Sequence, residues 1–190
     1  SLAAGTIFHD RYVVEALAGR GGMRVVYRAH DRSTGRTVAL KIFKDKDSHS
    51  VERFTREVEL LAELEHPAVV EHIDHGLADT SPYLAMEWLE GEDLAARLAR
   101  GPLDVDEVIT LATRIAEALT LAHQRGIVHR DVKPSNIFLP GGSIDQAKIL
   151  DFGIAKVRGG AQFTRFGEAL GTPAYMSPEQ AKGGGEIDAR

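Results

Sequence analysis

The polar residues between positions 129 and 153 constrain this chain more than any other feature. The sequence reads H-R-D-V-K-P-S-N at 129–136 and D-F-G at 151–153. Asp131 is a carboxylate on a short loop after an apolar strand, where it can orient a hydroxyl group and accept its proton. Asn136 and Asp151 offer hard oxygen atoms from adjacent strand ends, the kind of small ligand set that Mg²⁺ takes beside phosphate oxygens. The spacing therefore predicts a proton acceptor and metal ligands arranged for phosphoryl transfer.

Further motifs occur in a fixed order around these two runs. They are a Gly-rich turn at 18–24, V-A-L-K at 38–41 and S-P-E at 177–179. One isolated tripeptide is more often a surface turn or a strand end, but the joint order argues against that interpretation. On these motifs, the chain from about Tyr12 to Glu179 resembles the bacterial, eukaryotic-like (Hanks-type) Ser/Thr protein kinases.

The resemblance implies an α+β, two-lobed fold of the protein-kinase type. Residues 1–11 would form an N-terminal extension, and residues 12–88 an N-lobe with a five-stranded antiparallel sheet and one helix. Residues 89–190 would form a partial, helical C-lobe with an activation loop at 151–179. The apolar patterns agree with this division. They predict strands at 12–17, 25–29, 37–43, 70–73 and 83–87, and helices at 51–64, at 94–100 and after the capping residue Asp104.

The resemblance also assigns the catalytic roles. Asp131 would be the catalytic base, Lys133 would lie beside the transferred phosphoryl group, and Asn136 and Asp151 would hold Mg²⁺. Lys133 and Thr172, within G-T-P-A-Y-M-S-P-E, imply protein substrates that accept phosphate on Ser or Thr rather than Tyr.

ATP would be held largely by the N-lobe. Lys41 is the single charged residue of an apolar strand and must find partners. The resemblance pairs it with the α- and β-phosphates and with Glu57 on the helix at 51–64. Met86 would guard the adenine pocket, and Asp93 would hold the ribose. The other implied nucleotide contacts are Gly19, Gly21, Gly22, Val26, Ala39, Glu87, Leu89 and Phe138.

The Gly-rich turn departs from the kinase pattern at one position. Arg24 stands where G-x-G-x-x-G has its third glycine. Its side chain would either add a cation near the phosphates or point into solvent. The turn joins two strands, whereas the dinucleotide-binding motif joins a strand to a helix, so a Rossmann fold is the weaker interpretation.

A polar, Gly-containing segment at 154–175 is typical of a mobile activation loop. A phosphate on Thr164 would add negative charge and could pair with Arg130, which would order the loop. Similar kinases often carry a second Thr two residues later, but this chain has Phe166 there.

Composition limits the other function classes. The net charge of −5 and the absence of a basic cluster argue against nucleic-acid binding. The chain has no Cys, which excludes disulfides and thiolate metal sites, and it has no apolar run long enough to cross a membrane. We therefore expect a cytoplasmic segment, with a membrane anchor elsewhere in the protein left open.

His72 and His75 suggest a metal pair, but a structural role is favoured because other ligands are not clustered nearby in the sequence.

The sequence ends at Arg190, where the kinase pattern would continue into further helices. We expect the long helix after Asp104 to expose apolar surface, which would favour self-association. Three alternatives follow from Arg24 and from this ending: a nucleotide-binding pseudokinase or regulatory scaffold, a fragment that is inactive by itself, and an interaction module that needs no ATP.

Overall fold

The computed structural model describes residues 2–21, 24–44, 48–79, 81–152, 173–182 and 188. The chain divides into two compact units. The first comprises Ser1–Glu63 and Val70–Leu89, and the second comprises Leu64–Val69 and Glu90–Arg190.

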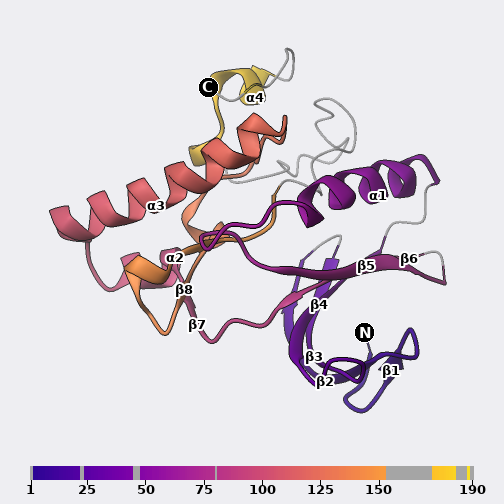
Figure 1. Ribbon diagram of the computed structural model, residues 1–190. Helices are drawn as coiled ribbons and strands as arrows, with labels where there is room; N and C mark the ends of the chain where they lie inside the picture. Colours follow the sequence, from indigo (N-terminus) through magenta and orange to yellow (C-terminus); the bar gives the residue numbers. More distant parts are fainter. Residues whose placement is uncertain are drawn as a thin grey trace. The chain divides into compact units, whose positions relative to one another are not determined.

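The first unit is built on a curled antiparallel sheet (Figure 1). Its strand order is β1-β2-β3-β4-β6-β5. The strands are β1 Ile7–Phe8, β2 Tyr12–Arg20, β3 Arg24–Asp31, β4 Thr37–Phe43, β5 His72–Ala78 and β6 Ser81–Glu87. The described part thus has a 6-stranded sheet where five strands were expected, because the two-residue strand β1 pairs with the start of β2.

One face of this sheet carries the apolar core of the first unit. Successive side chains of a strand point to opposite faces, so the alternating apolar residues of β3, β4 and β6 gather on one side. The cluster at its centre consists of Tyr12, Ala29, Val38, Leu40, Tyr83 and Ala85. Its burial explains why the period-two pattern of the sequence predicted these strands.

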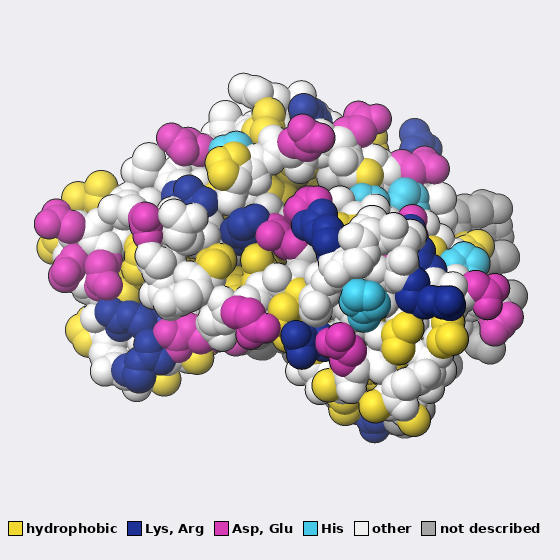
Figure 2. Space-filling view, turned by 60° about the horizontal axis from the view of Figure 1, so that its bottom comes forward, with side chains coloured by type: hydrophobic (Ala, Val, Ile, Leu, Met, Phe, Trp, Pro, Cys, Tyr) yellow, Lys and Arg dark blue, Asp and Glu magenta, His cyan; other side chains and the backbone are white. Residues whose placement is uncertain are grey.

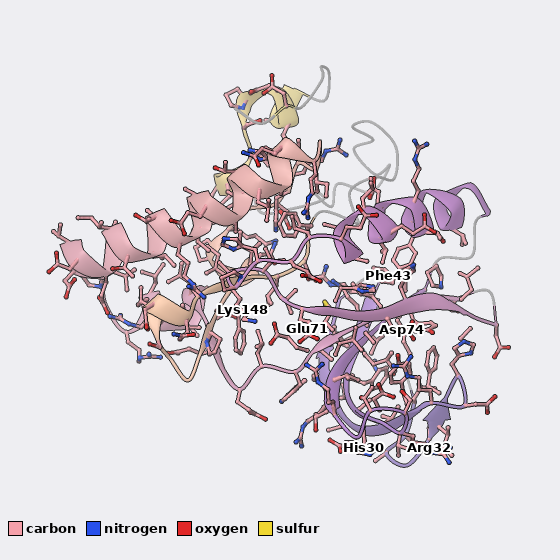
Figure 3. The ribbon with its side chains drawn as sticks, in the orientation of Figure 1. His30, Arg32, Phe43, Glu71, Asp74 and Lys148 are labelled. Carbon is pink, nitrogen blue, oxygen red and sulfur yellow. The ribbon has the colours of Figure 1, made fainter. Side chains whose placement is uncertain are left out.

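A charged cluster is built into the same unit. The Asp31 side chain is fully buried and accepts two hydrogen bonds from Arg11, each 2.8 Å long. Arg11 also donates to Oδ2 of Asp74 at 2.9 Å, and this oxygen accepts from the hydroxyls of Tyr12 and Tyr83 as well. Figure 3 labels Asp74. The Arg11 guanidinium holds the pKa of Asp31 well below its usual range. Burial, with the Asp74 carboxylate, raises the pKa of Tyr83 to about 12.

Helix α1, Ser48–Ala62, packs beside β5 in the first unit. Phe54 and Val58 are buried, and the ring centroid of Phe54 lies 4.9 Å from that of Phe43, which Figure 3 labels. The apolar spacing that predicted a helix at 51–64 is confirmed, although the helix begins three residues earlier and ends two residues earlier.

The second unit combines a small sheet with helices (Figure 1). Its strands, in the order β7-β8-β9, are β7 Gly91–Asp93, β8 Ile137–Pro140 and β9 Lys148–Ile149. The helices are α2 Leu94–Ala99, α3 Val105–Gln124 and α4 Pro178–Lys182, with short 3-10 helices at Pro134–Asn136, Ile144–Gln146 and Pro173–Tyr175.

The long helix α3 begins at the predicted cap. Asp104 accepts a hydrogen bond from the Glu107 backbone at 2.8 Å, and the Glu107 carboxylate accepts one from the Asp104 backbone at 3.0 Å. This reciprocal pair satisfies backbone donors of the first turn.

Among the described residues, no helix combines the length and the hydropathy that a membrane span needs.

Only one half of the apolar stripe of α3 is covered by the described residues. Ile115, Ala118 and Ala122 are buried. By contrast, the three large apolar residues near the start of the helix, Val105, Val108 and Ile109, are 73%, 49% and 58% exposed. The expected exposed apolar surface is therefore present. Elsewhere on the surface, Lys and Arg side chains lie among Asp and Glu side chains on the face that Figure 2 shows.

Candidate active site

The predicted catalytic base is held by its own loop. Asp131 Oδ2 accepts a hydrogen bond from Asn136 Nδ2 at 2.9 Å and forms an ion pair with Lys133 Nζ at 3.1 Å. The side chains of Asp131 and Lys133 are 23% and 18% exposed, so both remain accessible to solvent and to small groups. Two donors on one oxygen fix the orientation of the carboxylate.

Asn136 connects this carboxylate to the small sheet of the second unit. It is buried at the end of a 3-10 helix that begins at Pro134, and its backbone oxygen accepts from Leu150 N at 2.8 Å. Its side-chain Nδ2 donates to both the backbone oxygen and the carboxylate of Asp131. Since both partners are acceptors, the amide oxygen must point away from Asp131. That oxygen is the atom a metal ion needs.

The buried side chain of His129 supports the loop. The sequence analysis did not assign this residue to the site. The imidazole is 1% exposed, with Nε2 at 2.9 Å from the Leu150 backbone oxygen and Nδ1 accepting from Asp131 N at 3.2 Å. Its ring packs on that of Phe152, with centroids 4.7 Å apart. The histidine therefore ties the H-R-D loop to the start of D-F-G, and its place before Arg130 in that motif was the available signal.

Backbone strain marks the same two motifs. Arg130 has φ of 61° and Asp151 has φ of 52°, in the left-handed region that non-Gly residues rarely adopt. The Arg130 backbone oxygen accepts from Gln180 Nε2 at 2.8 Å, so α4 supports this conformation. Such conformations persist only where surrounding contacts impose them, and they occur often at functional sites.

The predicted phosphate-binding lysine is in the first unit. Lys41 is 2% exposed, and its Nζ lies 5.6 Å from the centre of the Phe43 ring. Glu57 is half-buried on α1. The ion pair between Lys41 and Glu57 stays a prediction.

The predicted adenine-facing residues of the first unit share one face of its sheet. In the ladder, Val26 lies opposite Lys41 and Ala39 lies opposite Met86. Directly opposed residues project to the same side, so these four side chains form the face opposite the apolar core. Val26 and Ala39 are half-buried there, whereas Met86 is 8% exposed.

The other predicted nucleotide contacts divide between the units. Glu87 ends β6, its backbone N–H donates to the Glu71 oxygen at 3.0 Å, and half-buried Leu89 ends the first unit. In the second unit, Asp93 is opposite Phe138 in the small sheet. Asp93 also caps α2, because its Oδ1 accepts from Ala96 N at 2.8 Å.

The Gly-rich turn is described in part. Gly19 lies within β2, and Gly21 N donates to the Arg24 backbone oxygen at 2.9 Å. Arg24 begins β3 with a half-buried side chain. The predicted residues Gly22, Gly153, Thr164 and Thr172 lie outside the described residues.

The family follows from comparison with known proteins. Residues 12–188 match the family described as "Protein kinase domain". The chain belongs to the protein kinase family. This bears out the resemblance inferred from its motifs and the two-lobed α+β fold class.

Individual kinases show the extent of the likeness. The serine/threonine-protein kinase pkn2 of Myxococcus xanthus is 40% identical over 192 residues, which cover 97% of this chain and 23% of pkn2. The solved kinase domain of Mycobacterium tuberculosis PknI is 31% identical with a TM-score of 0.79, covering 100% of this chain and 71% of that one. Rad53 1–466, solved in complex with AMP-PNP, is 31% identical with a TM-score of 0.74, covering 91% of this chain and 43% of that one.

The chain thus spans about a quarter of the length of pkn2.

Proposed function

We propose that this chain is the catalytic region of a Ser/Thr protein kinase that transfers the γ-phosphoryl group of ATP to protein hydroxyl groups. The observation that carries the proposal is the double contact of Asp131 Oδ2 with Asn136 and Lys133. A carboxylate fixed in this way, with a lysine beside it, suits a group that orients an acceptor hydroxyl and takes its proton. The names of the relatives support the same activity.

The residues fit a magnesium ion that arrives with the nucleotide. Asn136 uses its amide hydrogens on Asp131 and so presents its oxygen, and Asp151 offers a carboxylate from a strained position. One amide and one carboxylate, completed by phosphate oxygens and water, form a set that Mg²⁺ accepts. When bound, Mg²⁺ would neutralise charge on the transferred phosphate. Lys133 would remain beside Asp131, where its charge also favours a phosphoryl group.

The nucleotide itself would lie against the sheet face of Val26, Ala39, Lys41 and Met86. Lys41 would bind the α- and β-phosphates, and the half-buried apolar side chains would contact the adenine. Glu87 and Leu89 would contact the adenine edge through their backbone, Phe138 would cover its other face, and Asp93 would bind the ribose with the oxygen that does not cap α2. The complex of Rad53 with AMP-PNP supports an adenine nucleotide as the ligand.

Regulation by the activation loop is part of the proposal. Thr164 would receive a phosphate by autophosphorylation, and Arg130 would pair with it. Phosphoryl transfer would take place in the cytoplasm, where ATP and the protein substrates are present.

The test separates the metal role from the base role. In the 190-residue chain, Asp151→Asn is expected to weaken binding of Mg-ATP more than binding of ATP without magnesium, because it removes a metal ligand. In the full-length protein, Asp131→Asn should leave Mg-ATP affinity intact while peptide phosphorylation falls by about 10²- to 10⁴-fold. Asp106→Asn, on the exposed first turn of α3, is the matched control and should change neither quantity.

Two outcomes would overturn these assignments. Equal losses with and without magnesium would remove Asp151 from the metal site, and retained turnover would remove Asp131 from catalysis. Nucleotide binding by a full-length protein without any phosphorylation would identify a nucleotide-binding scaffold instead of a kinase.

A further inference from the structure

Two histidines of the first unit meet outside the residues assigned to Mg-ATP. His72 and His75 both lie on β5, which is at one edge of the described sheet. His72 Nε2 and His75 Nδ1 are 3.0 Å apart, and the ring centroids are 5.0 Å apart.

A bulge brings these rings together. In a regular strand, residues three positions apart point to opposite faces. The pairing register of β5 shifts between His72 and Asp74, and the inserted residue restores both histidines to one face. The ladder confirms this, since His72 lies opposite Met86 and His75 lies opposite Leu84.

The intervening carboxylate belongs to the other face. Asp74 is opposite Ala85, a residue of the apolar core, and its Oδ2 is engaged by Arg11, Tyr12 and Tyr83. The label in Figure 3 marks its position on β5. Asp74 therefore belongs to the charged cluster and not to the histidine pair, which consists of two imidazoles.

The separation of the two nitrogens fits chelation. An imidazole nitrogen binds a transition metal at about 2.0–2.1 Å, so two nitrogens at right angles around one ion are about 2.9 Å apart. Tetrahedral ligands at the same bond length are about 3.3–3.4 Å apart. The observed 3.0 Å is a hydrogen-bond distance, and it is short enough for both nitrogens to reach one ion in either arrangement.

We propose that His72 and His75 form a chelating site for a divalent transition-metal ion, with Cu²⁺ preferred over Ni²⁺ and over Zn²⁺. Imidazole nitrogens suit these ions, and the general order of affinities gives Cu²⁺ the first place. Among the described residues, no group of three His, Cys, Asp or Glu residues could hold a metal ion. Water therefore completes the coordination, and the ion exchanges readily.

Metal binding replaces the hydrogen bond between the two rings. Without metal, one ring donates its N–H to the other ring. On binding, that ring carries its proton on its other nitrogen instead, so that both facing nitrogens present a lone pair to the ion.

Copper titration of the 190-residue chain tests the site, with glycine present as a competing weak chelator and no nucleotide. Electron paramagnetic resonance of the bound Cu²⁺ should show two nitrogen ligands. Paramagnetic broadening in NMR spectra of the wild-type chain should reach the imidazole signals of His72 and His75 before those of the other histidines. His72→Gln and His75→Gln should each weaken binding by at least about tenfold. His123→Gln, a half-buried histidine on α3, is the matched control and should leave the affinity unchanged.

Several results would overturn the proposal. One is an electron paramagnetic resonance spectrum with a single nitrogen ligand on Cu²⁺. Another is a Cu²⁺ affinity of the double variant His72→Gln/His75→Gln equal to that of the wild type. A third is NMR broadening that begins at the signals of other histidines. Failure of stoichiometric copper binding would show that the pair only shares a proton. Because no nucleotide is present, none of these results bears on the proposed kinase activity.

Discussion

Asn136 donates from its side-chain amide to two oxygens of Asp131, the backbone carbonyl at 2.8 Å and carboxylate Oδ2 at 2.9 Å. One residue therefore positions the predicted base and, through its remaining oxygen, offers a ligand to the predicted metal. These two roles can be separated by substitution, because an aspartate at this position keeps the oxygen but loses the donor.

We expect Asn136→Asp in the full-length protein to keep the magnesium dependence of ATP binding while turnover falls by about 10²-fold or more. The new carboxylate can ligate the metal, but it faces Asp131 without a hydrogen to donate and repels it. Nucleotide titration with and without magnesium, together with peptide phosphorylation, measures both effects. Turnover at the wild-type level would show that Asp131 needs no support from Asn136.

Arg11 and Arg36 provide a matched pair for stability. Arg11 neutralises the fully buried carboxylate of Asp31, whereas Arg36 pairs with Glu71 at the surface, where both side chains are about half exposed. Arg11→Ala leaves a buried charge without its partner and should lower the free energy of unfolding by about 3 kcal/mol. Arg36→Ala should cost less than about 1 kcal/mol. Urea unfolding of the two variants compares them, and similar losses would contradict the role given to burial.

The same cluster predicts how stability depends on pH. The pKa of Asp31 is lowered in the folded chain, so its contribution is present above the unfolded value of about 3.9 and is lost as the pH falls below it. The pKa of Tyr83 is raised to about 12, so its contribution is present below about pH 10 and is lost as the pH rises from there. Asp31→Asn should flatten the acid limb of a stability profile and leave the alkaline limb, whereas Tyr83→Phe should do the reverse. An acid limb that is unchanged in Asp31→Asn would exclude this carboxylate as its source.

The parts of the candidate site that lie close together in sequence could be predicted from the sequence. Asp131, Lys133 and Asn136 fall within one short loop, so their motif carries their mutual geometry, and the structure brings them into contact. The cap of α3 was predictable for the same reason, because Asp104 and Glu107 are close together in the sequence. What the motif did not reveal is that His129 contacts Leu150, because that contact joins segments 21 residues apart.

The fold was least predictable where polar residues or short lengths interrupt the pattern. Strand β1 has two residues and therefore no periodicity to detect. Strand β5 was expected at 70–73 but runs over His72–Ala78, since His72, Asp74 and His75 hide the alternation and the bulge changes its phase. These polar side chains are tolerated because Asp74 has three donors around it and the histidines contact each other.

The last prediction concerns two glycines with nearly the same φ angle. Gly91 has φ of 146° and Gly101 has φ of 142°, so the backbone strains an alanine at both positions. They differ in their surroundings. A Cβ atom on Gly91 would lie 2.2 Å from the Leu139 backbone oxygen, whereas nothing lies within 4 Å of one on Gly101. Gly91→Ala must therefore displace the pairing of β7 with β8, and we expect it to destabilise the chain by at least about 1–3 kcal/mol more than Gly101→Ala does. Thermal and urea unfolding of both variants measure the difference, and hydrogen exchange at β8 should rise only in Gly91→Ala. Equal destabilisation would mean that backbone strain alone determines the loss of stability. The contact between the added Cβ atom at Gly91 and the Leu139 backbone oxygen would then be relieved at no cost in free energy.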